Sequence, residues 1–264
     1  VLPTCSASER CASRPITYAK KRIFCKIRSH GDRASGEIGY FCVKETTMKP
    51  IIAPVDRALL LEELTPRRKV RDTNKASNEI YIFEASECPA LMREVGRLRE
   101  IAVRQGGGGT GQEVDIDEED LAGDGYYQLI VWDPAAREIV GGYRFIVCTS
   151  EHPRHLSTEH YFDFSEQFRR DYLPYTIELG RSFVQPSYQV RGNAKSIYAL
   201  DNIWDGLGAL IVLNPHARYL FGKVTMYTTY KQVCRNALIW FLREYFPDRD
   251  QLVTARNPLG LDLD

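Results

Sequence analysis

The chain has 264 residues, of which 44% are hydrophobic and 11% aromatic, a composition typical of one large folded domain or two small ones. Its formal net charge is zero, and residues 48–264 carry 26 Lys and Arg against 31 Asp and Glu, which argues against general nucleic-acid binding because that needs a basic face. No apolar stretch approaches the ~18 residues that span a bilayer and no secretory leader is recognisable, so we expect a cytoplasmic protein that at most touches the inner face of a membrane.

Residues 1–47 differ from the rest of the chain. They hold nine Lys and Arg against four Asp and Glu, and four of the seven cysteines, whose spacings match no zinc-binding pattern. The first methionine is Met48, and all recognisable periodicity follows it. We therefore expect residues 1–47 to be an extension, disordered or extraneous, with a regulatory basic arm as the alternative, and residues 48–264 to form the domain.

The first predicted elements follow a proline-rich lead. Residues 79–84 alternate between polar and apolar like a strand, and residues 88–104 carry apolar side chains at helical spacing. The glycines at 106–109 end that helix. An acidic loop, residues 113–120, comes next.

Two strands are predicted after the acidic loop, at residues 127–132 and 139–147. Residues 133–137, which include a proline, form the hairpin turn between them. Residues 148–173 are polar and aromatic. We expect a surface insertion there, with a short amphipathic helix at residues 164–172.

The remaining elements are a long strand at residues 175–184, a helix at 194–213, a strand at 219–226 and a helix at 230–246 that ends before a proline. The order β-α-ββ-β-α-β-α predicts a mixed sheet with helices on its faces. The fold class is α/β, or α+β.

A strand that enters a helix through Gln189-Val-Arg-Gly-Asn-Ala194 has the form of a phosphate cradle. Gly192 allows close approach of the backbone, and the N–H groups at the helix start point at an anion. Taken alone, the stretch would be assigned to a helix-capping turn, because short glycine patterns of this kind also arise by chance. If the stretch binds a cofactor phosphate, the predicted binding residues are Gln189, Arg191, Gly192, Asn193 and Ala194.

Four further motifs accompany this stretch in a fixed order: Leu98-Arg99, Asp117-Glu-Glu-Asp120, Val140-Gly-Gly-Tyr-Arg144 and Glu178-Leu-Gly-Arg181. With the cradle, which matches the pyrophosphate signature of the GNAT superfamily, they make residues 48–253 resemble the GNAT-like N-acyltransferases that draw acyl chains from acyl carrier protein. The resemblance is closer to the makers of ornithine and glycine lipids, in a group labelled hemolysin-like, and more distant to the acyl-homoserine-lactone synthases. It implies a mostly antiparallel sheet with helices on both faces.

Two departures from these families affect the expectations. The lactone synthases carry an aromatic residue and a tryptophan soon after the first motif arginine, whereas Val103 and the glycine run stand here, which disfavours lactone synthesis. The lipid-forming relatives continue beyond the end of this chain. We therefore expect the last strands of the sheet to be lacking at the C-terminus.

The chemistry of N-acyl transfer assigns roles to the charged motif residues. An ammonium must lose a proton before it attacks, so Glu178 is the candidate general base, as the resemblance also implies; the alternative is a buried salt bridge with Arg181 or Arg144. Arg144 and Arg181 either contact the substrate carboxylate or form a scaffold network with Asp117 and Asp120.

The other candidate site residues follow from the same reading. Arg99, Asp117 and Asp120 are assigned to the substrate side. Backbone N–H groups of residues 183–185, which include Phe183 and Val184 and end at Gln185, are expected to hold the thioester oxygen, where strand 175–184 splays from strand 219–226 to admit pantetheine. No metal and no covalent nucleophile are expected.

These interpretations predict a transfer of a 3-hydroxy fatty acyl chain from acyl carrier protein to the α-amine of glycine or ornithine, in the synthesis of an aminolipid. The donor is acyl-phosphopantetheine, on the carrier protein or on coenzyme A, and no cofactor is permanently bound. A basic patch is expected to meet the acidic carrier, from Arg191, Lys195, Arg218, Lys223 and Lys231. The alternatives are acylation of another amine for a signal molecule, a membrane-active cytolysin, and an inactive module.

Overall fold

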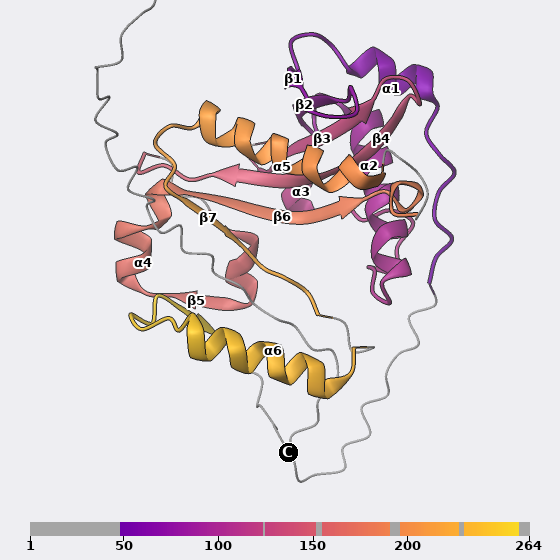
Figure 1. Cartoon of the computed structure of the whole chain (residues 1–264). Helices are drawn as coiled ribbons and strands as arrows, with labels where there is room; N and C mark the ends of the chain where they lie inside the picture. Colours follow the sequence, from indigo (N-terminus) through magenta and orange to yellow (C-terminus); the bar gives the residue numbers. More distant parts are fainter. Residues whose placement is uncertain (1–47, 124, 152–154, 191–195, 227–229, 259–264) are drawn as a thin grey trace, which may run out of the picture.

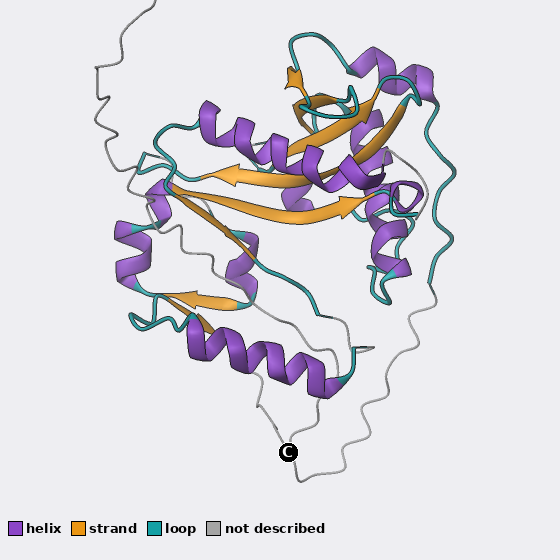
Figure 2. Cartoon of the chain, viewed as in Figure 1, coloured by secondary structure: helices purple, strands orange, loops and turns teal. Residues whose placement is uncertain are grey.

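The structure is a computed structural model that describes residues 48–258 apart from 124, 152–154, 191–195 and 227–229 (Figures 1 and 2). The strands are β1 (Lys69–Asp72), β2 (Glu79–Glu84), β3 (Tyr127–Asp133), β4 (Glu138–Val147), β5 (Phe162–Phe164), β6 (Thr176–Val184), β7 (Tyr219–Gly222) and β8 (Val253–Ala255). The α-helices are α1 (Arg57–Glu63), α2 (Pro89–Gln105), α3 (Glu118–Leu121), α4 (Glu166–Asp171), α5 (Ser196–Leu213) and α6 (Gln232–Tyr245). Short 3₁₀ turns are η1 (Ser157–His160), η2 (Leu173–Tyr175) and η3 (Pro186–Tyr188). The expectations for residues 1–47 lie outside the described residues.

A six-stranded sheet in the order β1-β2-β3-β4-β6-β7 forms the centre of the fold, and β5 pairs with β8 in a separate two-stranded sheet. All neighbours in the large sheet are antiparallel except β6 and β7, which are parallel. This confirms the predicted mixed, mostly antiparallel α/β fold.

Helices cover both faces of the sheet (Figure 1). The apolar residues of α2 recur every three or four positions, so they form one stripe that packs with α1 on the face that carries Ile130 and Trp132. α5 covers the opposite face, where its Ile203 and Leu210 join Leu129 and Val131 of the same strand. The alternation of β3 therefore gives the two helices separate cores.

A third core contradicts the expected surface insertion at residues 148–173. Leu156, Phe162, Phe164 and Phe168 are buried there and pack with Phe221 of β7. The polar residues between these aromatics suggested solvent exposure. The aromatic residues instead recur at positions that face inward.

Most predicted elements are confirmed within a few residues, and the structure adds several that were not predicted. The acidic loop contains α3, whose Asp117 and Asp120 form a reciprocal capping box at its start. β7 ends at Gly222 and not at residue 226. The expected helix at 194–213 is α5, and residues 194 and 195 lie outside the described part. The elements α1, β1, β5 and β8 were not predicted, because each has seven residues or fewer and a weak periodic pattern.

A bulge in β6 shapes the edge of the large sheet. Gly142 of β4 lies opposite Phe183, but Arg144 lies opposite Gly180, so two residues of β6, Arg181 and Ser182, face a single residue of β4. Arg181 has a φ of 51°, in the left-handed region that non-glycine residues rarely adopt. Pairing between β6 and β7 ends just before the bulge, at Leu179 and Gly222.

One helix departs from the expectation that no segment could span a membrane. By length and composition α5 is apolar enough to do so, with 28% of that window buried in the fold. Here it lies along the sheet, and Asp205 accepts a hydrogen bond from the backbone N–H of Asn74 at 2.8 Å. The same pattern is found in helices that cover a sheet, so it is weak evidence for membrane insertion.

Two glycines offer a matched test of this packing. A Cβ at Gly142 would clash with the carbonyl oxygen of Leu129 on the neighbouring strand, whereas one at Gly208 of α5 would meet nothing within 4 Å. We expect Gly142→Ala to lower the free energy of unfolding by about 1–3 kcal/mol. Gly208→Ala should raise it by about 0.5–1 kcal/mol, because alanine favours a helix. Denaturant unfolding of both variants checks this, and equal effects would contradict the register of β3 and β4.

Candidate active site

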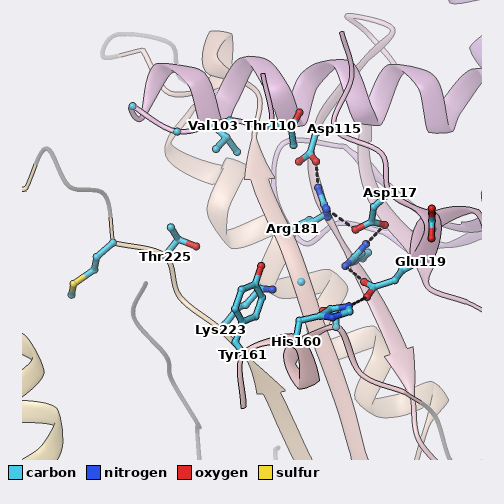
Figure 3. Close-up of a pocket in the computed structure, with 18 of the residues that line it drawn as sticks. Val103, Thr110, Asp115, Asp117, Glu119, His160, Tyr161, Arg181, Lys223 and Thr225 are labelled. Carbon is cyan, nitrogen blue, oxygen red and sulfur yellow. Dashed lines mark hydrogen bonds and ion pairs between the residues drawn. The ribbon is translucent and has the colours of Figure 1, made fainter. Parts of the chain in front are cut away.

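A cleft of about 710 Å³ lies beside the point where β6 and β7 part (Figure 3). The residues just beyond the last pair, Gly180, Arg181 and Lys223, line it. The other walls come from the glycine loop after α2, from the segment that leads into α3, and from η1. The splay predicted between these two strands is therefore present, and it begins at Gly180.

Arg144 crosses the floor of the cleft. In the sheet register Gln128, Arg144 and Gly180 form one row across β3, β4 and β6. Because Gly180 has no side chain, the guanidinium passes over it; an added Cβ would lie 3.4 Å from Nε of Arg144. The guanidinium also stacks on the ring of Tyr126, at 4.3 Å from its centroid.

Carboxylates of α3 and its N-cap surround Arg144. Its Nη1 lies 2.7 Å from Oδ1 of Asp117 and 3.3 Å from Oδ1 of Asp120, and its Nη2 lies 2.6 Å from Oε2 of Glu119. Burial alone would lower the pKa of Arg144, but Asp120 and Asp117 outweigh it and raise the pKa above its usual range. Arg144 therefore stays charged and fixes α3 on the sheet.

Arg181 extends the same network from the bulge. Its Nη2 lies 2.5 Å from Oδ2 of Asp117, and its Nη1 forms an ion pair with Asp115. Asp117 thus bridges the two arginines, as the dashed lines in Figure 3 show for its bond to Arg181. The ion pairs offset the strain of the positive φ at Arg181.

Behind the cleft, Arg99 of α2 is fully buried with Asp120. Nη1 of Arg99 lies 3.2 Å from Oδ2 of Asp120, and the amide of Gln128 both accepts from Arg99 and donates to Asp120 at 3.0 Å. Burial would raise the pKa of Asp120, but Arg99 and Arg144 lower it below its ordinary value. Arg99, Asp120 and Gln128 therefore link α2, α3 and β3 through hydrogen bonds.

Glu178 has a different environment from the one expected for an open general base. It is 1% exposed, and its carboxylate accepts hydrogen bonds from the backbone N–H of Ser157 at 3.2 Å and of Thr158 at 3.1 Å. The hydroxyls of Ser157 and Tyr126 also donate to it. Among the described residues, no ion pair joins Glu178 to Arg144 or Arg181, so the expected buried salt bridge is wrong.

The structure brings together three of the predicted site residues, Asp117, Arg144 and Arg181, on the cleft wall. The lining does not include the predicted site residues Arg99, Asp120, Glu178, Phe183, Val184 and Gln189. Their predicted roles in catalysis or binding stay predictions. The scaffold interpretation of the arginines and aspartates agrees with every contact described above.

The structure describes the predicted oxyanion segment completely but only the beginning of the predicted cradle. The backbone N–H of Gln185, at the end of the expected oxyanion segment, already donates to the carbonyl of Val140 at 2.8 Å. The amide of Gln189 donates to the carbonyl of Val184 at 2.6 Å, which ties the first cradle residue to β6. The other cradle residues, Arg191, Gly192, Asn193 and Ala194, lie outside the described residues.

Several cleft residues were missed from sequence. His160 and Tyr161 follow the segment that Glu178 holds, and Nε2 of His160 lies 2.9 Å from Oε1 of Glu119. Lys223, expected on a basic surface patch, instead lies in the cleft. The strand predicted at residues 219–226 ran through Lys223, so the sequence pattern carried no signal of this position. Arg218, another member of that predicted patch, stacks on Tyr175 at 4.8 Å.

The cleft can therefore bind a small molecule that carries both charges. One wall offers the partly exposed carboxylates of Asp117 and Glu119, and another offers the ammonium of Lys223. Among the described residues, no group of three His, Cys, Asp or Glu side chains is placed to hold a metal ion.

Comparisons with known proteins agree with the fold. A model of the acetyltransferase (GNAT) domain matches residues 98–199. The chain is 49% identical over 223 residues to a glycine N(alpha)-acyltransferase of Phocaeicola vulgatus, which covers 82% of this chain and 68% of that protein. It is 51% identical over 221 residues to a glycine N(alpha)-acyltransferase of Bacteroides thetaiotaomicron, covering 81% of this chain and 66% of the relative. The chain thus spans about two thirds of the length of each, and no solved structure matches it significantly.

The contacts of Glu178 predict a structural cost when its charge is removed. In Glu178→Gln the amide keeps one acceptor oxygen but turns an NH₂ group toward N–H and O–H donors. We expect the free energy of unfolding to fall by about 2–5 kcal/mol, with faster hydrogen exchange at Ser157 and Thr158. The control is Glu87→Gln, an exposed acid paired with Arg68, which should change stability by less than about 0.5 kcal/mol. Lost acyl transfer with unchanged melting and exchange would show that Glu178 acts as the base and not as an anchor.

The lowered pKa of Asp120 predicts a pH-dependent contribution to stability. The folded protein keeps this carboxylate charged where the unfolded chain, with a pKa of about 3.9, takes up a proton. The contribution is therefore fully present above that value and is lost as pH falls through the folded pKa. We expect Asp120→Asn to destabilise the protein by about 3–5 kcal/mol at pH 7, with a smaller difference from wild type at pH 3.

Denaturant unfolding at several pH values measures this difference. The control is Asp163→Asn, since Asp163 and its partner Arg256 are both exposed and that pair should contribute little at any pH. A difference between wild type and Asp120→Asn that stays constant from pH 7 to pH 3 would contradict the assignment.

Proposed function

The chain belongs to the family of GNAT acyltransferases that includes the glycine N(alpha)-acyltransferases, and we propose that it transfers an acyl chain to the α-amine of glycine. The proposal is carried by the 49% identity to the Phocaeicola vulgatus enzyme, which extends over 82% of the chain. Glycine is proposed as the acceptor because the relatives are glycine N(alpha)-acyltransferases. Acyl transfer itself is the property that the GNAT domain match supports.

The proposed reaction forms an amide from an amine and a thioester. The ammonium of glycine first loses a proton, and its nitrogen then attacks the thioester carbonyl carbon. The C–N bond forms, the C–S bond breaks, and the sulfur leaves as a thiol after it takes up a proton. The second proton of the attacking nitrogen is released, so the step needs no oxidant, metal or covalent enzyme intermediate.

The charges of the cleft support a zwitterionic acceptor. Asp117 and Glu119 are each about 30% exposed, so their oxygens can accept hydrogen bonds from the ammonium while they remain paired with Arg144. The glycine loop after α2 and Gly180 line the cleft with little side-chain volume. An acceptor without a side chain suits a site in which charge, and not apolar contact, dominates the walls.

The proposed donor is a fatty acyl thioester of phosphopantetheine, carried by acyl carrier protein or coenzyme A. The parting of β6 and β7 at Gly180 supports it, because a narrow arm can enter between strands that no longer pair. The predicted cradle at residues 189–194 follows the same strand. The product would be a single-chain N-acylglycine, an amphiphile that partitions into membranes, and the proposed location is the cytoplasm or the inner membrane face.

The proposal predicts which acceptor the protein prefers. With an acyl carrier protein loaded with a 3-hydroxy fatty acyl chain, the wild-type chain should convert glycine to N-acylglycine, measured by mass spectrometry, with one thiol released per amide. Ornithine at equal concentration should react at least about 10-fold more slowly, because its second ammonium adds charge without an assigned partner. A preference for ornithine would contradict the acceptor, and thiol release without amide would contradict N-acyl transfer.

A further inference from the structure

Lys223 is the first residue after β7, at the point where that strand leaves β6. Its side chain lies in the cleft, and Nζ lies 4.2 Å from the centroid of the Tyr161 ring (Figure 3). A ring face attracts the ammonium but offers it no oxygen acceptor. Tyr161 therefore positions the ammonium of Lys223 but does not accept a hydrogen bond from it through the ring face.

The other basic side chains of the cleft have carboxylate partners. Arg144 is paired with Asp117, Asp120 and Glu119, and Arg181 with Asp115 and Asp117. His160 contacts Glu119. Within the described part of the chain, no carboxylate oxygen lies within 4.0 Å of Nζ of Lys223, so among these basic side chains of the cleft it alone has no acidic partner there.

The electrostatic surroundings keep this ammonium available. Burial lowers the pKa of Lys223 to about 8, with Arg144 and Arg181 acting in the same direction and Glu178 and Glu119 opposing them. At pH 7 the side chain is therefore mostly charged. A partly buried cation without a counter-charge is unfavourable, and an anionic ligand group in the cleft would supply the missing charge.

We propose that Lys223 binds the carboxylate of the amino-acid acceptor, opposite Asp117 and Glu119, which face its ammonium end. This inference rests on the proposed function and adds to it the residue that recognises the acceptor. The charges then match a zwitterion: two partly exposed acids lie on the α3 wall, and beyond β7 lies one cation for which the described residues supply no acidic partner. Lysine suits this task because its ammonium is a compact point charge that a single carboxylate can satisfy.

The test compares glycine with glycinamide, in which a neutral amide replaces the carboxylate. The wild-type protein should acylate glycine with a kcat/KM at least about 10-fold above that for glycinamide, because a charge-assisted hydrogen bond is lost. Lys223→Met keeps the length of the side chain and removes its charge. It should lower kcat/KM for glycine by about 10- to 100-fold, mainly through KM, and change that for glycinamide by less than about 3-fold.

Two further variants sharpen the comparison. Lys223→Arg keeps the positive charge and should retain more glycine activity than Lys223→Met. Lys75→Met removes an exposed lysine in the turn before β2, outside the cleft, and should leave both substrates unchanged. Thermal melting of each variant shows whether it is folded.

The outcomes separate this inference from the proposed function. If wild type acylates glycine but Lys223→Met loses activity toward glycine and glycinamide equally, Lys223 does not read the carboxylate and the inference is overturned alone. A wild-type protein that uses both substrates equally well would overturn it without any variant. If wild type acylates no glycine at all, the proposed function fails and the inference fails with it.

Discussion

A buried carboxylate must have its charge compensated, and in this protein that requirement builds the walls of the cleft. Glu100 is fully buried and accepts hydrogen bonds from the N–H groups of Thr110 and Gly111, both at 2.9 Å, which fixes the glycine loop. Glu178 holds the η1 segment in the same way, through Ser157 and Thr158. In both walls, a carboxylate of a helix or strand accepts hydrogen bonds from backbone N–H groups of the segment that lines the cleft.

The arginine network follows the same logic with the charges reversed. Arg144 lies in a central strand, where a free guanidinium would be unfavourable, so α3 must sit over it with acidic residues at its N-terminus. Those acids also favour the helix, since negative charge near a helix start is stabilising. The short helix exists at this place because its capping residues and the counter-ions of Arg144 are the same side chains.

The large elements were predictable from sequence because their periodicity is local. The alternation of β2 and β3 and the apolar stripe of α2 each appear within one continuous segment. The partners of Glu178 could not be predicted in that way, since Ser157 and Thr158 lie about 20 residues away and contribute backbone N–H groups, which every residue except proline possesses. A mid-strand acid indicated a buried charge correctly, but its pattern does not say whether a cation, a hydroxyl or a loop compensates it. Lys223 was missed as a cleft residue for a related reason: its strand was predicted to continue to residue 226, and only the early end of β7 at Gly222 places Lys223 in the cleft.

Structure and proposed chemistry are linked through one continuous chain of contacts. Glu178 fixes Ser157 and Thr158, the segment they begin carries His160 and Tyr161, and the ring of Tyr161 positions the ammonium of Lys223. A change at Glu178 would therefore disturb the proposed acceptor site without any contact between Glu178 and the acceptor. Loss of activity in a Glu178 variant is accordingly ambiguous between lost proton transfer and a displaced Lys223. The two differ in kind: a displaced Lys223 weakens recognition of the carboxylate and raises KM for glycine more than for glycinamide, whereas a missing base lowers kcat for both acceptors alike.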